Sequence, residues 1–183
     1  VQWLRDRMKF FKKAPETEKI VKSLQNNNDI YLVPAFTGLG APYWDANARG
    51  VLSGITRDTS PKEIVRATIE AVAYQTYDLF EAMKHDGLRP KIVKVDGGMV
   101  MNNWFSQFLS DIVNVKVLRP KVQETTALGA AFMAGLNIGV YKSLKDISKN
   151  WQLDKKFSSK MKNSSRNILI DGWEKAVKRA LIN

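Results

Sequence analysis

The stretch Ile92-Val93-Lys94-Val95-Asp96-Gly97-Gly98-Met99-Val100-Met101-Asn102 decides the fold predicted for this chain. Its first four residues have the β-prone composition of a buried strand. The paired glycines predict a tight turn, because Gly tolerates positive φ and carries no side chain. A helical apolar spacing over residues 104–112 follows the turn. Strand, turn and helix in this order form the repeating unit of an α/β sheet.

The same alternation extends on both sides of this stretch. Ser60 and Glu63 have the spacing of a capping box and Pro61 suits the first helical position, so a long helix is predicted from there to Asp86-Gly87. Further strands are predicted at residues 30–33, 50–55 and 115–118, and further helices from about residue 126 and over 173–181. Alternating strands and helices predict a mixed or parallel central sheet with helices on both faces.

Composition divides the 183 residues into three parts within one principal domain. Residues 1–28 open directly in a helical pattern, and we expect them to be a helical lead-in that continues an upstream part of a larger protein. Residues 29–141 are the predicted α/β core. Residues 142–183 are rich in Lys, and we expect a basic C-terminal helical extension.

The net charge of +11 is concentrated at the two ends of the chain. Residues 1–22 carry seven basic and three acidic side chains and residues 142–183 carry eleven and four, so the middle is balanced. The basic residues near the end stand among Ser and Asn rather than among aromatic side chains. This pattern favours a solvated basic surface over a nucleic-acid groove.

The absence of cysteine excludes disulfides and thiolate metal sites, and with no secretory leader visible it favours a cytoplasmic protein. The longest stretch without a formal charge, residues 125–141, is shorter than the roughly 20 apolar residues that a membrane span needs. We expect it to be a buried helix with its exit loop, and we expect no membrane partner.

The glycine turn is the best candidate site. Bare backbone at Gly97 and Gly98 would let a planar or anionic ligand reach main-chain amides at the start of the next helix. Asn102 could contact that ligand or cap the helix, and Asp96 could cap the turn or act through magnesium. The only histidine, His85, has no partner for catalysis and is predicted to lie on the surface. Three other acids are predicted to be turn or solvated helix-face residues: Asp45, Asp78 and Asp111.

Four collinear motifs resemble the FGGY carbohydrate kinases. Residues 50–55 and 63–70 are similar to the second signature of that family, and residues 34–45 resemble the members that act on glycerol. Residues 95–103 resemble the family's adenosine motif, and residues 124–131 its last strand-to-helix block.

The resemblance implies an actin-like ATPase, ribonuclease H-like domain, with residues 1–183 as the C-terminal nucleotide-binding domain. It implies that Gln2 contacts the nucleotide near its phosphate or ribose, that Gly98 and Asn102 line the adenine and ribose pocket, and that Gly97 permits the approach. The implied ligands are ATP with Mg²⁺, and glycerol, which would receive the γ-phosphoryl group to give sn-glycerol 3-phosphate.

The resemblance assigns no catalytic residue and no metal ligand to this chain, because the corresponding family residues precede Val1. We therefore expect the chain by itself to be inactive. We also expect the full-length enzyme to be a homo-oligomer. Three alternatives remain open: the C-terminal half of another sugar or polyol kinase such as a xylulokinase, a basic nucleic-acid-binding module, and a stand-alone regulatory domain.

Overall fold

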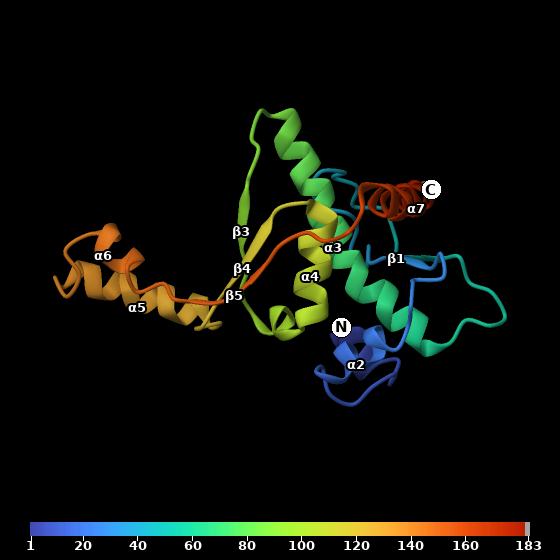
Figure 1. Ribbon diagram of the computed structural model, residues 1–183, viewed down its shortest axis with the longest axis horizontal. Helices are drawn as coiled ribbons and strands as arrows, with labels where there is room; N and C mark the ends of the chain where they lie inside the picture. Colours follow the sequence, from blue (N-terminus) through green and yellow to red (C-terminus); the bar gives the residue numbers. More distant parts are fainter. Residues whose placement is uncertain (182–183) are drawn as a thin grey trace.

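The computed structural model describes residues 1–181, and Figure 1 shows its elements in sequence order. The helices are α1 (Gln2–Asp6), α2 (Glu16–Lys22), α3 (Pro61–His85), α4 (Asn103–Val113), α5 (Thr125–Asn137), α6 (Leu144–Ser148) and α7 (Asn163–Leu181), with a 3-10 turn η1 (Gly98–Met101). The strands are β1 (Tyr31–Val33), β2 (Val51–Ser53), β3 (Ile92–Lys94), β4 (Lys116–Pro120) and β5 (Leu153–Phe157).

The strands form two small sheets. Strands β1 and β2 pair antiparallel, with Leu32 opposite Leu52. Strand β4 lies between β3 and β5, parallel to the first and antiparallel to the second. Helix α4 joins the parallel pair, because parallel strands need a crossover connection. This arrangement confirms the predicted α/β class with a mixed sheet.

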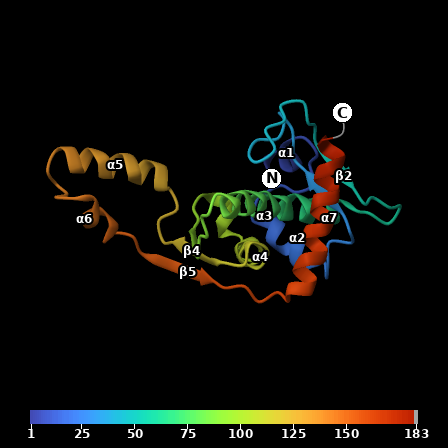
Figure 2. The same cartoon turned by 90° about the horizontal axis from the view of Figure 1, so that it is seen from above.

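Helix α3 organises the core. Its predicted capping box is present, since the Ser60 side chain accepts from Lys62 N and the Glu63 carboxylate accepts from Ser60 N. The helix packs against α2, α4 and β1, and Figure 2 shows α2, α4 and α7 gathered around it. At its middle, the Tyr74 ring stacks on Trp173 of α7 with centroids 5.3 Å apart.

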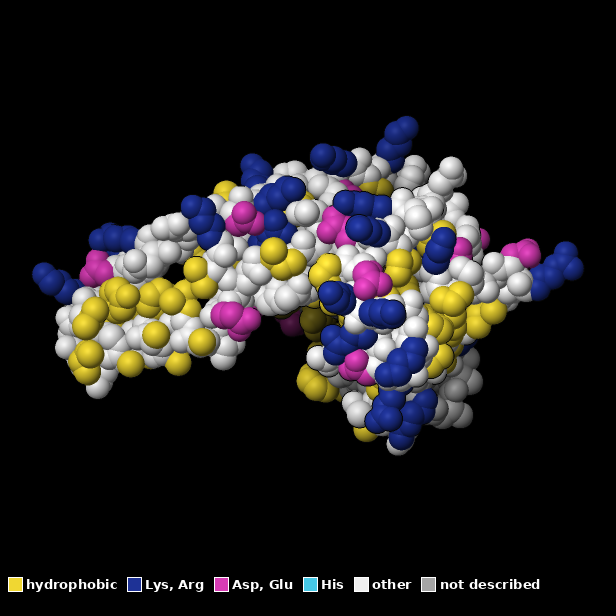
Figure 3. Space-filling view, turned by 90° about the horizontal axis from the view of Figure 1, so that it is seen from below, with side chains coloured by type: hydrophobic (Ala, Val, Ile, Leu, Met, Phe, Trp, Pro, Cys, Tyr) yellow, Lys and Arg dark blue, Asp and Glu magenta, His cyan; other side chains and the backbone are white. Residues whose placement is uncertain are grey.

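Helices α5 and α6 project from the body as an arm, residues 125–148, on the side of the three-stranded sheet away from α3 (Figures 1 and 2). Gly135 is the one buried residue of α5, and apolar side chains cover much of the arm surface in Figure 3. The prediction of a buried helix over residues 125–141 is therefore wrong for this chain, because no other element of residues 1–181 packs extensively on α5. No helix in residues 1–181 is long and apolar enough to cross a membrane.

The C-terminal segment holds an element that the sequence does not predict. Strand β5 pairs with β4 although four of its five residues are exposed, so it has no apolar alternation to reveal it. Helix α7 begins at Asn163, ten residues before the predicted start at Trp173. The prediction missed its first turns because they are polar and show no apolar spacing.

Candidate functional site

The turn between β3 and α4 presents bare backbone to solvent. Gly97 has φ 81° and ψ 174°, a conformation open essentially to Gly alone. A Cβ built on Gly97 or on Gly98 would meet no atom within 4 Å. Packed side chains therefore do not enclose these glycines, and a flat group can approach their main chain.

Buried side chains hold this turn from behind. Arg119 of β4 donates through Nη1 to the carbonyl of Val100 at 2.8 Å, and Ser106 Oγ donates to the same carbonyl at 2.9 Å. The Arg119 guanidinium also pairs with Asp154 of β5, Nε to Oδ2 at 2.7 Å. No sequence motif points to Arg119, because β4 carries a second cation, Lys116, and only the fold shows which of the two is buried. Its contacts fix η1 in place while the opposite side stays open.

The Asn102 side chain caps α4. Its Oδ1 accepts from Phe105 N at 3.0 Å, and its Nδ2 donates to Thr17 Oγ1 of α2 over a long 3.4 Å. The structure thus shows the capping role that the sequence left open, and it ties the turn to α2. Asn102 is half-buried, so its amide borders the same surface as the glycines.

The first turn of α4 is already occupied by a carboxylate. Glu18 of α2 accepts from Asn103 N through Oε2 at 3.4 Å. Burial acts to raise the pKa of Glu18, but hydrogen bonding and charge attraction from Lys22 lower it overall, so the carboxylate is ionised. An anion at this helix start would meet that negative charge. Glu18 accepts from one amide at this helix start, Asn103 N, whereas the backbone at Gly97 and Gly98 is open. That a ligand reaches main-chain amides at the start of α4 stays a prediction.

Two other predicted residues, Gln2 and Asp96, share no hydrogen bond with Asn102 within residues 1–181. Gln2 opens α1 and is exposed, and within residues 1–181 no hydrogen bond joins its side chain to the turn. Asp96 is exposed and accepts a hydrogen bond from the Thr125 hydroxyl at the start of α5. The described residues contain no group of three or more His, Cys, Asp or Glu side chains that could hold a metal ion.

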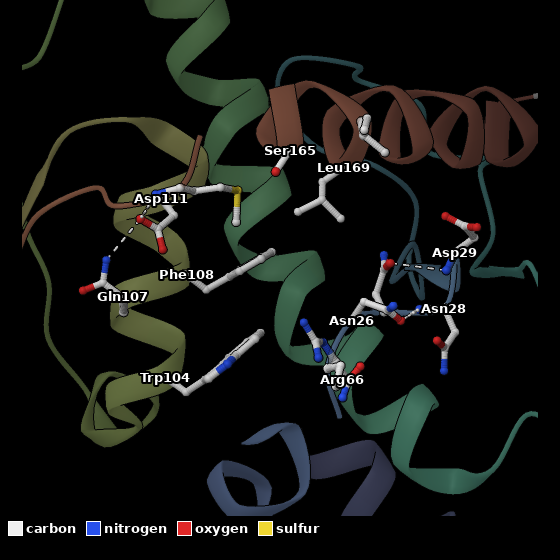
Figure 4. Close-up of a pocket in the computed structure, with 14 residues that line it drawn as sticks. Asn26, Asn28, Asp29, Arg66, Trp104, Gln107, Phe108, Asp111, Ser165 and Leu169 are labelled. Atoms are coloured by element: carbon white, nitrogen blue, oxygen red, sulfur yellow. Dashed lines mark hydrogen bonds between the residues drawn. The ribbon is translucent and has the colours of Figure 1, made fainter. Parts of the chain in front are cut away.

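A cavity of about 680 Å³ lies elsewhere, between the loop at residues 25–29, α4 and α7 (Figure 4). Trp104 and Phe108 stack with centroids 4.9 Å apart and form one wall. The Arg66 guanidinium lies 5.1 Å from the Trp104 ring and donates through Nη1 to Leu24 O at 2.7 Å. These contacts join the loop to the core, and no ligand motif of the sequence falls on the cavity lining.

Helix α3 carries a buried ion pair whose cation, Arg66, lines this cavity. Arg66 Nε donates to Glu70 Oε1 at 2.7 Å, and the Tyr74 hydroxyl donates to Glu70 Oε2 at 3.0 Å. Burial raises the pKa of Glu70, although Arg66 and Tyr74 act in the opposite direction. Arg66 and Glu70 therefore help to position α3 against the loop at residues 24–29.

Two acids predicted as turn or solvated helix-face residues are buried, and that prediction is wrong for both. Asp78 is 7% exposed and accepts from Trp173 Nε1 at 2.9 Å, and burial raises its pKa to about 6. Asp111 is 8% exposed, and its Oδ1 accepts from Lys160 N at 2.6 Å and from Met161 N at 3.2 Å. Each acid binds the C-terminal segment to the core. The spacing of residues along the chain cannot show such a distant partner.

The remaining two sequence predictions agree with the structure. Asp45 is a turn residue whose Oδ1 accepts from Asn47 N at 2.8 Å and from Ala48 N at 3.0 Å. His85 is the exposed last residue of α3.

Comparison with known proteins places this geometry in context. The model of the FGGY family of carbohydrate kinases, C-terminal domain, matches residues 1–138. The chain is 54% identical over 179 residues to glycerol kinase 1 of Pseudomonas aeruginosa. The aligned region covers 98% of this chain and 36% of that relative. The chain thus spans little more than a third of the length of the curated relatives it matches.

Solved structures give the same picture. The chain resembles a crystal structure of Plasmodium falciparum glycerol kinase with ADP, with a TM-score of 0.87 and 37% identity over 100% of this chain and 37% of that one. A ligand-bound xylulose kinase from Lactobacillus acidophilus has a TM-score of 0.75 at 24% identity, over 97% of this chain and 36% of that one, and shows the shared fold.

Proposed function

We propose that the intact protein is a glycerol kinase, since the chain belongs to the FGGY family of carbohydrate kinases and corresponds to their C-terminal domain. It would transfer the γ-phosphoryl group of ATP to glycerol and give sn-glycerol 3-phosphate. The observation that carries the proposal is the 54% identity to a glycerol kinase along almost the whole chain. The named xylulose kinase reaches only 24%, so we favour glycerol over a ketose.

The contribution of this chain would be a seat for the adenosine half of the nucleotide. The open backbone at Gly97 and Gly98 would accept the flat base, and Asn102 would border the ribose. The phosphates would point away from α4, because Glu18 occupies its first turn. Gln2 would approach from α1 when the nucleotide is bound.

Mg²⁺ would arrive with ATP. This ion is usually bound through substrate phosphates, waters and one or two carboxylates rather than by an all-protein cage. Asp96 directly precedes the glycine turn and is exposed, so its carboxylate could contribute. Such transfers depend on positioning and on neutralising the phosphate charge, and this chain would supply positioning.

The test is a coupled assay of ADP release by the intact protein, with glycerol and xylulose compared at equal concentration. We expect release that depends on glycerol and exceeds that with xylulose by at least tenfold in kcat/KM. Faster turnover of xylulose would contradict the proposal. The 183-residue chain assayed alone should give no glycerol-dependent ADP release.

The intact enzyme is proposed to be a cytoplasmic homo-oligomer that does not use nucleic acid. On the face of this chain shown in Figure 3, basic side chains are interspersed with acidic ones, as on a solvated surface. Sedimentation of the intact protein would give its oligomeric state. Duplex binding that persists at physiological salt would contradict the exclusion of nucleic acid.

A further inference from the structure

A cavity of about 460 Å³ lies where β3 and β4 begin, and its charged lining is entirely cationic. The cations come from three places: Arg89 precedes β3, Lys91 adjoins its first residue, and Lys116 opens β4. Asn114, Ser158 and Ser159 supply the polar remainder. The fold therefore gathers three positive charges and three neutral polar side chains around one hollow.

No ion pair in the described part of the chain neutralises these cations. Within residues 1–181 none of the three has a carboxylate oxygen within 4.0 Å, whereas six other cations of the chain do. Asp111 lies behind the loop at residues 158–161, where its carboxylate already accepts two backbone N–H groups of that loop. Like charges held together without a counterion repel one another, so an anion in the hollow would relieve that repulsion.

A buried arginine beneath the hollow orients its neutral groups. Arg166 is 8% exposed, and its Nη2 donates to Asn114 Oδ1 at 3.3 Å and to Ser159 Oγ at 3.0 Å. Because both oxygens accept from Arg166, the Asn114 amide NH₂ and the Ser159 hydroxyl hydrogen are left to donate elsewhere. The hollow thus offers hydrogen-bond donors as well as positive charge.

We propose that this hollow binds a phosphate group of a small molecule. A phosphate or pyrophosphate group carries two or more negative charges and several acceptor oxygens. The three cations match that charge, and the two or three neutral donors match the oxygens. The volume suits a small ligand rather than a nucleic-acid strand.

The hollow and the glycine turn lie at opposite ends of the same strands. The hollow adjoins the amino ends of β3 and β4, while Gly97 follows the carboxyl end of β3. One nucleotide bound at the turn would leave the hollow free, so this inference does not depend on the proposed kinase activity.

The test is calorimetric titration of inorganic pyrophosphate into the intact protein, with ADP present at saturation so that the nucleotide site is filled. The triple variant Arg89→Gln/Lys91→Gln/Lys116→Gln should weaken pyrophosphate binding at least tenfold. The matched control Lys12→Gln/Lys13→Gln/Lys62→Gln removes the same net charge from exposed positions elsewhere and should change it less than twofold.

A milder variant tests the donor role. Asn114 has φ 54°, so Asn114→Gly keeps the left-handed backbone and removes the amide. Pyrophosphate should then bind several-fold more weakly, while the ADP affinity stays unchanged. Equal losses in the two triple variants, no pyrophosphate binding to the parent protein, or tighter binding of a DNA oligonucleotide than of pyrophosphate would each overturn the proposal.

Discussion

Helices α3 and α5 invert the usual relation between polarity and burial. Helix α3 buries four charged side chains: Glu63, Arg66, Glu70 and Asp78. Helix α5 has no charged residue, yet only Gly135 is buried in it, and Met133 is 52% exposed. The difference shows that hydropathy alone does not place a helix. Partners do: each buried charge of α3 has a hydrogen-bond partner, whereas α5 has no element packed extensively against it.

The largest effect should follow from removing one partner of the buried ion pair. Arg66→Ala leaves the Glu70 carboxylate buried without its cation, and it should lower the free energy of unfolding by about 3–5 kcal/mol. Arg5→Ala breaks an exposed pair with Asp6 and should cost far less, because water screens that pair. Urea denaturation measures both. Similar losses of stability in the two variants would show that burial does not determine how much each ion pair contributes to the free energy of unfolding.

Asp78 should make stability depend on pH. Burial raises its pKa to about 6, above the roughly 3.9 of an unfolded Asp, so between these values the folded state holds a proton that the unfolded state has released. The contribution of Asp78 to the free energy of unfolding is therefore fully present below about pH 4. It decreases as the pH rises to about 6 and is absent at higher pH. Asp78→Asn should remove this part of the pH dependence, on the order of 2 kcal/mol. Urea midpoints from pH 4 to 7 would test this, and an unchanged slope would contradict the shifted pKa.

The smallest effect is expected on the arm. Met133→Gln should change the free energy of unfolding of this chain by less than about 0.5 kcal/mol, because the Met133 side chain is already largely exposed in the folded state. Phe108→Ala is the matched change in the body and should cost about 3–5 kcal/mol. A loss above about 2 kcal/mol for Met133→Gln would show that α5 packs against the body in solution.

The parts of the fold that follow from local rules could be predicted from sequence. The capping box at Ser60, the strand before Gly97 and the turn itself all depend on neighbouring residues. Strand β5 could not be predicted, because it is defined by pairing with β4 rather than by its own pattern. The burial of Asp78 likewise depends on Trp173, which is 95 residues away in the chain.

The candidate site divides in the same way. Paired glycines and a capping Asn are visible in the sequence, and the structure shows the open backbone and the cap. Glu18 could not be anticipated at the start of α4, because α2 is brought there by tertiary packing. The proposed direction of the phosphates, away from α4, therefore depends on a contact that no local pattern shows.

The most direct measurement of the nucleotide proposal is the ADP affinity of the Gly98→Ala variant of the intact protein. Gly98 does not have a positive φ, and an added Cβ meets no atom within 4 Å, so the variant should keep its melting temperature. Its methyl group would still occupy the surface where the base is proposed to lie. We expect ADP to bind at least tenfold more weakly, while Gly40→Ala, at a glycine that is equally open, leaves binding unchanged. Unaltered ADP affinity in a stable Gly98→Ala protein would contradict the account.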